Sequence, residues 1–262
     1  MPTMSGFRVL LGKELREQVR TYRMPVAAIV FLLFGVSSPV LARYTKELLD
    51  LLGTQATSGI QIVLPQPTAA DAIGQLLKNL GSFGILMAIL LAMGAVATEK
   101  ERGTAALILT KPASRLAFLL AKLVVIAVTL GVSVAVGLVF GWIYTVTLFD
   151  NAALNVAGYV AMAAFLWLTL LAYAALTLLG STLTSSTAGG AGFGFVALIV
   201  TGLVAALPTI GPFMPTSLNG PGADLALGLP VQLELWQPLL GTLLFIFVPF
   251  ALAWLSFRRQ EL

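Results

Sequence analysis

The sequence predicts an all-α polytopic membrane protein with six transmembrane helices and both ends of the chain in the cytoplasm. Hydrophobic residues make up 58% of its 262 residues, and charged residues make up only 10%. Soluble domains carry about 25% charged residues, so the composition excludes an ordinary globular domain. One transmembrane helix needs roughly 20 apolar residues. The chain therefore has room for about six spans with short connections, and for no large extramembrane domain.

The residue types that are missing restrict the chemistry of the chain. It contains no Cys and no His, which excludes disulfides, thiolate metal sites and histidine acid–base catalysis within it. Gly12-Lys13 is the only Gly-Lys pair, but a P-loop also needs an earlier glycine where Phe7 stands and Ser or Thr where Glu14 stands. We therefore expect no catalytic residue, no metal ligand and no bound cofactor in this chain.

Residues 7–23 are predicted to form an amphipathic helix before the first span. Apolar side chains recur every three or four residues along one helical stripe, and basic residues lie off it. Such a helix usually lies in the headgroup plane on the cytoplasmic side; the alternative is a solvated helix with no special role. The apolar positions are Phe7, Leu11, Leu15, Val19 and Tyr22. The polar residues that we assign to the interfacial helix are Lys13, Glu14, Arg16 and Arg20.

The spans follow from apolar runs and the turn signals between them. Residues 68–71, Thr-Ala-Ala-Asp, have the form of a capping box and predict a helix that leads into the second span. Asp150-Asn151 marks the turn after the third span, and residues 208–236 are rich in Pro and Gly. The predicted spans cover residues 24–42, 81–97, 116–144, 156–179, 189–207 and 239–257.

The distribution of basic residues predicts the orientation. With the N-terminus inside, 12 of the 15 Lys and Arg residues lie on the cytoplasmic side, and only Arg43, Lys46 and Lys78 lie outside. The positive-inside rule therefore places both termini in the cytoplasm. Lys122 is the only charged residue within the spans, about two turns from the cytoplasmic end, where we expect its ammonium to snorkel towards the interface.

Ion-coupled transporters need charged residues near the middle of the bilayer, and these spans have none there. If the protein moves a substrate uphill, the energy must come from another subunit.

The polar segment of residues 98–115 is the main cytoplasmic feature between two spans. Thr98 with Glu101 fits a second capping box, Ser114 is placed to cap the third span, and residues 105–110 form a helical window. These signals predict a short helix lying across the membrane plane. An apolar triplet, residues 107–109, needs cover from a partner or from lipid. The alternative is a simple connection whose composition follows only from the positive-inside rule. That alternative would explain the basic residues, but it would not explain Glu99, Glu101 or the apolar triplet.

This segment resembles the E-x-E-x-G-T…L-L…P-x-S-R signature of the type-2 ABC exporter (ABC-2) permeases. Residues 99–104 read Glu-Lys-Glu-Arg-Gly-Thr, and Lys13-Glu14-Leu15 with Arg20 is similar to the interfacial helix of that family. One departure is Ala121-Lys122, where the family usually has Gly-Lys. The resemblance implies a coupling helix that docks on an ATPase subunit. The implied interface residues are Glu99, Glu101, Arg102, Gly103, Thr104, Leu107, Ile108, Leu109, Pro112 and Arg115.

The resemblance further implies a half-transporter. A second copy or a homologue would complete the permease, and separately encoded ATPase subunits would bind ATP and Mg²⁺. It also suggests re-entrant helices and an external gate in residues 208–236; the alternative is an ordered surface loop. The Gly-x-x-x-Gly motifs at Gly137/Gly141 and Gly190/Gly194 permit close helix contacts, either within the chain or across a dimer seam.

The predicted function is therefore that of a multi-pass permease subunit in a bacterial or archaeal cell membrane. We expect it to contact lipid and not nucleic acid. An alternative is an ABC-type complex that acts on a periplasmic partner. The small size and the long external segment between Arg43 and Leu80 also resemble the permeases that mature the copper site of nitrous oxide reductase. A third possibility is a membrane scaffold that transports nothing.

Overall fold

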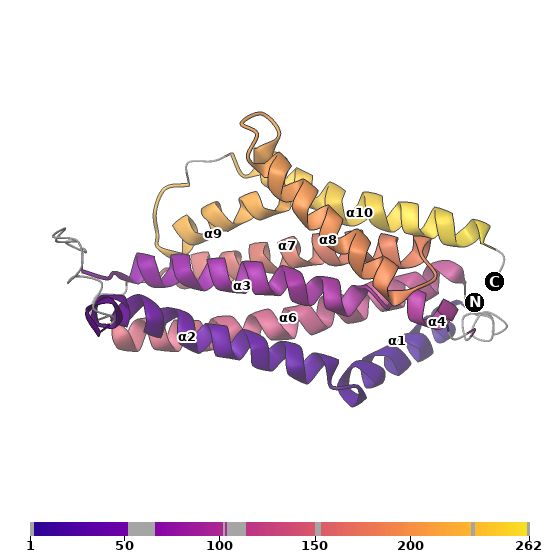
Figure 1. The fold of residues 1–262 in the computed structure, drawn as a ribbon, viewed down its shortest axis with the longest axis horizontal. Coiled ribbons are helices and arrows are strands. Elements are labelled where there is room, and N and C mark those ends of the chain that lie inside the picture. Colours follow the sequence, from indigo (N-terminus) through magenta and orange to yellow (C-terminus); the bar gives the residue numbers. More distant parts are fainter. Residues whose placement is uncertain are drawn as a thin grey trace.

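The computed structural model describes residues 3–51, 66–101, 103, 114–149, 153–231 and 234–260, and these form a long bundle of helices (Figure 1). No strand occurs in these ranges. The elements are α1 (Thr3–Arg20), α2 (Arg23–Leu51), α3 (Ala69–Ala92), α4 (Ala97–Glu101), α6 (Arg115–Leu148), α7 (Val156–Leu183), α8 (Thr187–Ala205), two 3₁₀ turns η1 (Gly211–Phe213) and η2 (Pro215–Leu218), α9 (Asn219–Ala226) and α10 (Trp236–Arg259).

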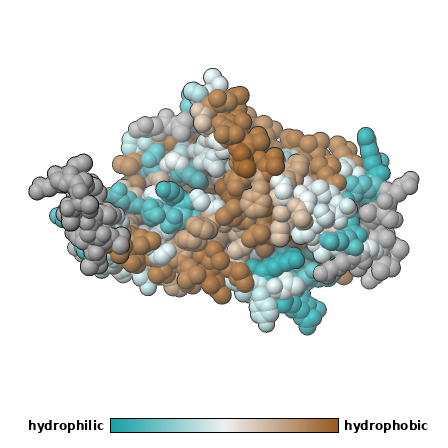
Figure 2. Space-filling view, in the orientation of Figure 1, coloured by the Kyte–Doolittle hydropathy of each residue, from teal (hydrophilic) through white to brown (hydrophobic). Residues whose placement is uncertain are grey.

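The prediction of an all-α fold with six spans is confirmed. Six helical stretches of the described chain are long and apolar enough to cross a bilayer: Arg23–Leu48, Ala69–Glu101, Arg115–Leu148, Val156–Leu183, Thr187–Ala205 and Trp236–Arg259. The start of α1 and the end of α10 lie at the same end of the bundle, beside α4 (Figure 1). On the face shown in Figure 2, apolar side chains cover the middle of the bundle and hydrophilic ones gather towards its ends.

The long external segment predicted between Arg43 and Leu80 is largely helical. Helix α2 continues to Leu51, and α3 begins at Ala69. Thr68 and Asp71 form the predicted capping box, in which Asp71 Oδ2 accepts from the Thr68 amide at 2.8 Å and Thr68 Oγ1 accepts from the Asp71 amide at 3.4 Å. This reciprocal cap lets the helix start well before the apolar run. The helix predicted to lead into the second span is therefore confirmed, and the connection between α2 and α3 lies between Leu51 and Ala69.

Helices α3 and α7 form the centre of the bundle. About two thirds of the most apolar stretch of each is buried, compared with 17% for α8. Phe31 of α2, Leu130 of α6 and Leu166 of α7 are fully buried and belong to the same apolar core. The remaining apolar faces of α2, α8 and α10 point outwards, as expected for helices that face lipid.

Both Gly-x-x-x-Gly motifs pack within the chain. A Cβ on Gly137 of α6 would lie 2.8 Å from the Phe31 carbonyl oxygen on α2, and a Cβ on Gly141 would overlap Leu76 of α3. On α8, Gly190 lies against the Met93 carbonyl and Gly194 against Thr177 of α7. Of the two alternatives left open by the sequence, the described contacts therefore favour close packing inside the chain.

Residues 208–236 fold back into the bundle. Thr169, in the middle of α7, donates its hydroxyl to the Pro215 carbonyl at 2.8 Å, and the Asn155 amide, just before α7, donates to the Ala226 carbonyl at 2.9 Å. Since these contacts are 14 residues apart along a helix, η2 and α9 follow about 20 Å of α7. The described part of the segment therefore packs along half the length of α7. A re-entrant placement in the membrane and a gating role stay predictions.

The packing at Gly137 generates the first testable prediction. Replacing Gly137 with Ala should lower the free energy of unfolding of the purified protein in detergent by about 1–3 kcal/mol, because the added Cβ meets the rigid backbone of α2. The melting temperature should fall accordingly. The matched control is Gly202→Ala on α8, where no atom lies within 4 Å of the added Cβ. That control should be neutral or slightly stabilising, since alanine is the better helix former. Equal melting temperatures for the two variants would contradict the packing argument.

Candidate functional site

Helix α1 turns a polar face towards the bundle and an apolar face away from it. Glu14 and Gln18 are buried, whereas Leu15, Val19 and Tyr22 are exposed. In an interfacial helix the outward apolar side chains contact lipid. The later part of the predicted apolar stripe thus points away from the protein core, whereas Phe7 and Leu11 are half-buried, and the buried polar residues Glu14 and Gln18 face the bundle.

The interfacial helix ends earlier than predicted. Helix α1 stops at Arg20, and α2 already begins at Arg23, so residues 7–23 are not one helix. Tyr22 between them has a φ of 59°, in the left-handed region that side chains other than glycine rarely adopt. This conformation breaks the helix and lets the chain change direction between α1 and α2 (Figure 1).

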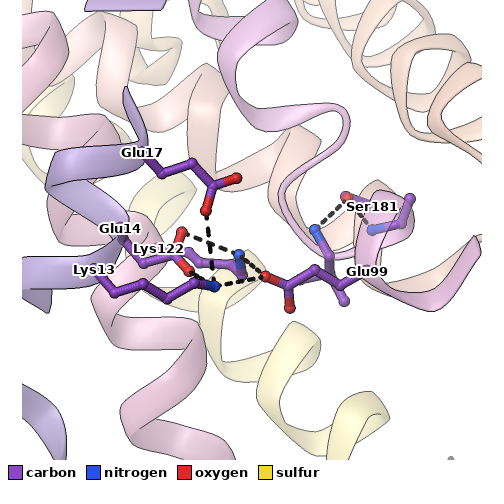
Figure 3. Close-up of polar contacts among 8 residues, drawn as sticks. Lys13, Glu14, Glu17, Glu99, Lys122 and Ser181 are labelled. Carbon is purple, nitrogen blue, oxygen red and sulfur yellow. Dashed lines mark hydrogen bonds and ion pairs between the residues drawn. The ribbon is translucent and has the colours of Figure 1, made fainter. Parts of the chain in front are cut away.

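A buried ion-pair cluster joins α1, α4 and α6 (Figure 3). The Lys122 ammonium of α6 lies 2.8 Å from Glu99 Oε1 on α4 and 3.2 Å from Glu14 Oε2 on α1. The Lys122 side chain is only 6% exposed, and its Nζ also lies 4.9 Å from the centroid of the Phe118 ring. We call the set Lys13, Glu14, Glu17, Glu99 and Lys122 the Lys122 cluster.

Lys13 extends the cluster towards solvent. Its ammonium lies 3.2 Å from Glu14 Oε1, and 3.7 Å from both Glu99 Oε1 and Glu17 Oε2. Partial burial alone would lower the pKa of Lys13, but these three carboxylates and the hydrogen bond to Glu14 outweigh it, and the pKa is raised. A raised lysine pKa stabilises the folded state below its ordinary value of 10.5, and this contribution is lost only as the pH rises above that value. Lys13 therefore stays charged at physiological pH.

Lys122 does not extend to solvent as a free snorkelling side chain. Glu14 and Glu99 come to it and cover its ammonium. Removing a charge from water is costly, and two hydrogen-bonded carboxylates offset that cost. Lys122 is thus a structural junction that the sequence analysis missed. The sequence did contain one indication of this role, because Lys122 is the only charged residue within the predicted spans.

Helix α4 is held by α7 and not by the capping box predicted at Thr98. The Ser181 hydroxyl of α7 accepts hydrogen bonds from the amides of Val96 and Ala97, each at 3.0 Å (Figure 3). Thr98 lies inside α4, and its hydroxyl is 3.1 Å from the Thr187 hydroxyl of α8. The first amides of α4 are therefore satisfied by a residue distant in sequence, and the prediction of Thr98 as the N-cap is wrong.

The predicted coupling residues fall into three groups. Glu99 points into the Lys122 cluster, while Glu101 and Gly103 are exposed at the end of α4. Arg115 donates to the carbonyls of Phe257, Arg258 and Gln260 at 2.8–3.0 Å and so caps the end of α10. The others, together with the proposed coupling helix, lie outside the described residues: Arg102, Thr104, Leu107, Ile108, Leu109 and Pro112. On α1, Arg16 and Arg20 are exposed.

The geometry ties both ends of the 102–113 segment to the membrane helices. Before it, Glu99 of α4 binds Lys122 of α6. After it, Ser114 Oγ accepts from the Ala117 amide at 3.1 Å and starts α6, as predicted, while Arg115 binds the end of α10. A displacement of this segment would act directly on α6 and α10, and on α1 through Glu14. In the part of the chain that the structure describes, no group of acidic residues is arranged to hold a metal ion.

These features define a polytopic helical membrane subunit with a short polar connection braced against its spans. Residues 8–262 match the family model of the ABC-2 family transporter proteins, and the chain belongs to that family. It is also 24% identical over 152 residues to the uncharacterized transmembrane protein YxlG of Bacillus subtilis (strain 168). That alignment covers 58% of this chain and 58% of YxlG. The resemblance inferred from the signature is confirmed for the family, whereas the link to nitrous oxide reductase receives no support.

The Lys122 cluster generates the second prediction. Replacing Lys122 with Met should lower the free energy of unfolding in detergent by about 3–5 kcal/mol, because Glu14 and Glu99 lose their buried partner. The control Lys46→Met changes an exposed lysine at the other end of the bundle and should stay within about 0.5 kcal/mol of the parent.

Neutralising both acids in the Lys122→Met background, with Glu14→Gln and Glu99→Gln, should recover most of the loss, since no uncompensated charge then remains. Denaturation curves of all four proteins provide the measurement. A Lys122→Met protein as stable as the Lys46→Met control would show that the cluster is not a structural junction.

Proposed function

We propose that this chain is the permease subunit of an exporter and that ATP hydrolysed by separate nucleotide-binding subunits drives its movements. The observation that carries the proposal is that the residues flanking 102–113 are held by other helices: Glu99 before it by the buried Lys122, and Arg115 after it by the end of α10. Membership of the ABC-2 family implies association with ABC ATPase subunits. A connection meant only to join two spans does not need Lys122, Ser181 and Arg115 to hold its flanks.

The coupling follows from the stiffness of these contacts. Charges within a region of low dielectric interact more strongly than at a solvated surface, so Glu99 cannot easily leave Lys122 unless another cation, such as Lys13, takes its place. A push on α4 by a docked ATPase is therefore passed to α6 and, through Glu14, to α1. Arg115 passes the same displacement to the end of α10. Four elements would shift together in response to one docking event.

The exporter is preferred over a complex that matures a periplasmic enzyme. That alternative rested on a resemblance in size and in the length of the external segment, and the family match and the relative give it no support. The exporter would also include a second permease copy or a homologue, as the resemblance to the ABC-2 permeases implies.

The proposed orientation places α1, α4 and the end of α10 in the cytoplasm. The chain has no Cys, so a single introduced cysteine reports the side of the membrane without interference. Glu47→Cys at the end of α2 should react with a membrane-impermeant maleimide in intact cells, whereas Glu101→Cys should react only after permeabilisation. Both glutamates are exposed. Labelling of the Glu101→Cys protein in intact cells would reverse the orientation and remove the proposed docking surface.

Docking is tested at Glu101, the exposed acid at the end of α4. Glu101→Lys reverses a charge at the edge of the proposed interface and should weaken binding of the ATPase subunit by about tenfold in a pull-down titration, with membrane insertion unchanged. The control Glu47→Lys makes the same change at the opposite end of the bundle and should bind the ATPase as the parent does. Equal binding by both variants would count against docking at this edge.

A further inference from the structure

A cavity of about 460 Å³ opens beside the Lys122 cluster, between α1, the end of α3 with α4, and α6. One side is polar and includes residues of α1 on the face that packs towards the bundle. The other side is apolar and contains the buried side chains of Leu91, Val125 and Ile126. Filling such a cavity with water alone would leave the apolar wall hydrated at a cost. The shape and polarity favour an amphiphilic occupant.

The charged side chains around the cavity balance. Among the described lining residues, three positive and three negative groups are present: Lys13, Arg23, Lys122, Glu14, Glu17 and Glu99. Arg23 forms no ion pair with any described residue and stands exposed at the start of α2. Glu17 is paired only distantly, at 3.7 Å from Lys13. Electrostatic complementarity therefore favours an occupant with no net charge that carries both an anionic and a cationic group.

Gln18 adds a second, independent indication of a ligand. It lines the cavity from α1 and is only 7% exposed, and no described residue donates a hydrogen bond to its buried Oε1. A buried acceptor without a donor costs about 1–3 kcal/mol. The terminal torsion of glutamine is soft, so the amide oxygen can turn towards a donor that enters the cavity. The missing partner is an N–H or O–H group.

We propose that this cavity binds the head group of a phospholipid that carries both a phosphate and a primary ammonium, of the phosphatidylethanolamine class. The ammonium donates to Gln18 Oε1 and to the Glu17 carboxylate, and the phosphate lies against Arg23 and Lys13. The outward apolar face of α1, with Val19 and Tyr22 exposed, places the cavity at headgroup depth. A bound lipid would fix α1 against α6. The proposal rests on the membrane placement of α1 and not on ATP-driven transport.

The test uses the full-length chain, purified in detergent and stripped of lipid. Phosphatidylethanolamine, phosphatidylcholine and phosphatidylglycerol with identical acyl chains are titrated while the melting temperature is followed, and bound lipid is identified by native mass spectrometry. Phosphatidylcholine matches the charge of phosphatidylethanolamine but has no N–H donor. We expect half-maximal stabilisation at about tenfold lower phosphatidylethanolamine than phosphatidylcholine, the effect of one charge-assisted hydrogen bond.

Gln18→Leu should abolish this selectivity while leaving the melting temperature without lipid unchanged or higher, because it removes a buried acceptor that lacks a donor. If Gln18 had a purely structural role, the substitution would instead lower the melting temperature measured without lipid. The control Gln237→Leu makes the same change in a partly exposed residue of α10 away from the cavity and should keep the tenfold preference. Should Gln18→Leu fail to fold, Arg23→Gln at the exposed rim must weaken phosphatidylethanolamine binding, or the proposal fails.

Other outcomes would overturn the assignment. Equal stabilisation by phosphatidylethanolamine and phosphatidylcholine would exclude recognition of the amine, and strongest stabilisation by phosphatidylglycerol would exclude a zwitterionic site. A shift produced by soluble phosphoethanolamine at the same concentration as the lipid would exclude a lipid site in favour of a small metabolite. None of these readouts involves ATP or a partner subunit, so failure here leaves the proposed transport function intact.

Discussion

One buried ammonium organises the end of this bundle where α1, α4 and α6 meet. Lys122 is nearly inaccessible to solvent, and a charge in that position is tolerated only if opposite charges are close and well oriented. Glu99 and Glu14 meet that requirement, and each comes from a different element. The positions of α1 and α4 are therefore not independent choices of the fold. Both helices must lie where their carboxylates reach the same nitrogen atom.

Contacts that are local in sequence could be predicted, and contacts between distant segments could not. The caps at Thr68 and Ser114 depend on residues three positions apart, so the sequence alone identifies them. Apolar runs determine the six spans for the same reason, since span length and composition are local properties. By contrast, the Lys122–Glu14 pair joins residues 108 positions apart. No periodicity or motif identifies such a partner.

The contacts that Thr98 and Arg115 make share a physical cause, although only the capping prediction at Thr98 is wrong. Each residue type has the chemistry that was expected of it, but a neighbour from another helix satisfies or uses that chemistry first. Ser181 reaches the free amides at the start of α4, so a local cap is not needed. Arg115 finds the free carbonyls at the end of α10, which any helix leaves unsatisfied. Where helices crowd together at one end of a bundle, their exposed backbone groups compete for the same polar side chains.

A junction built from ion pairs would suit the movements that the proposed transport function requires. Apolar packing between helices weakens gradually as they separate and has little directional preference. The Lys122 cluster instead joins two ammonium groups and three carboxylates through five N–O distances of 2.8–3.7 Å, so a small shift of α4 changes which carboxylate each lysine binds best. Lys13 already lies within 3.7 Å of Glu99, the carboxylate that Lys122 binds most closely. Exchange of that carboxylate between the two lysines would let α4 and α1 change position with every charge still paired. An all-apolar junction at the same place would hold the helices together but would define no second paired arrangement for them.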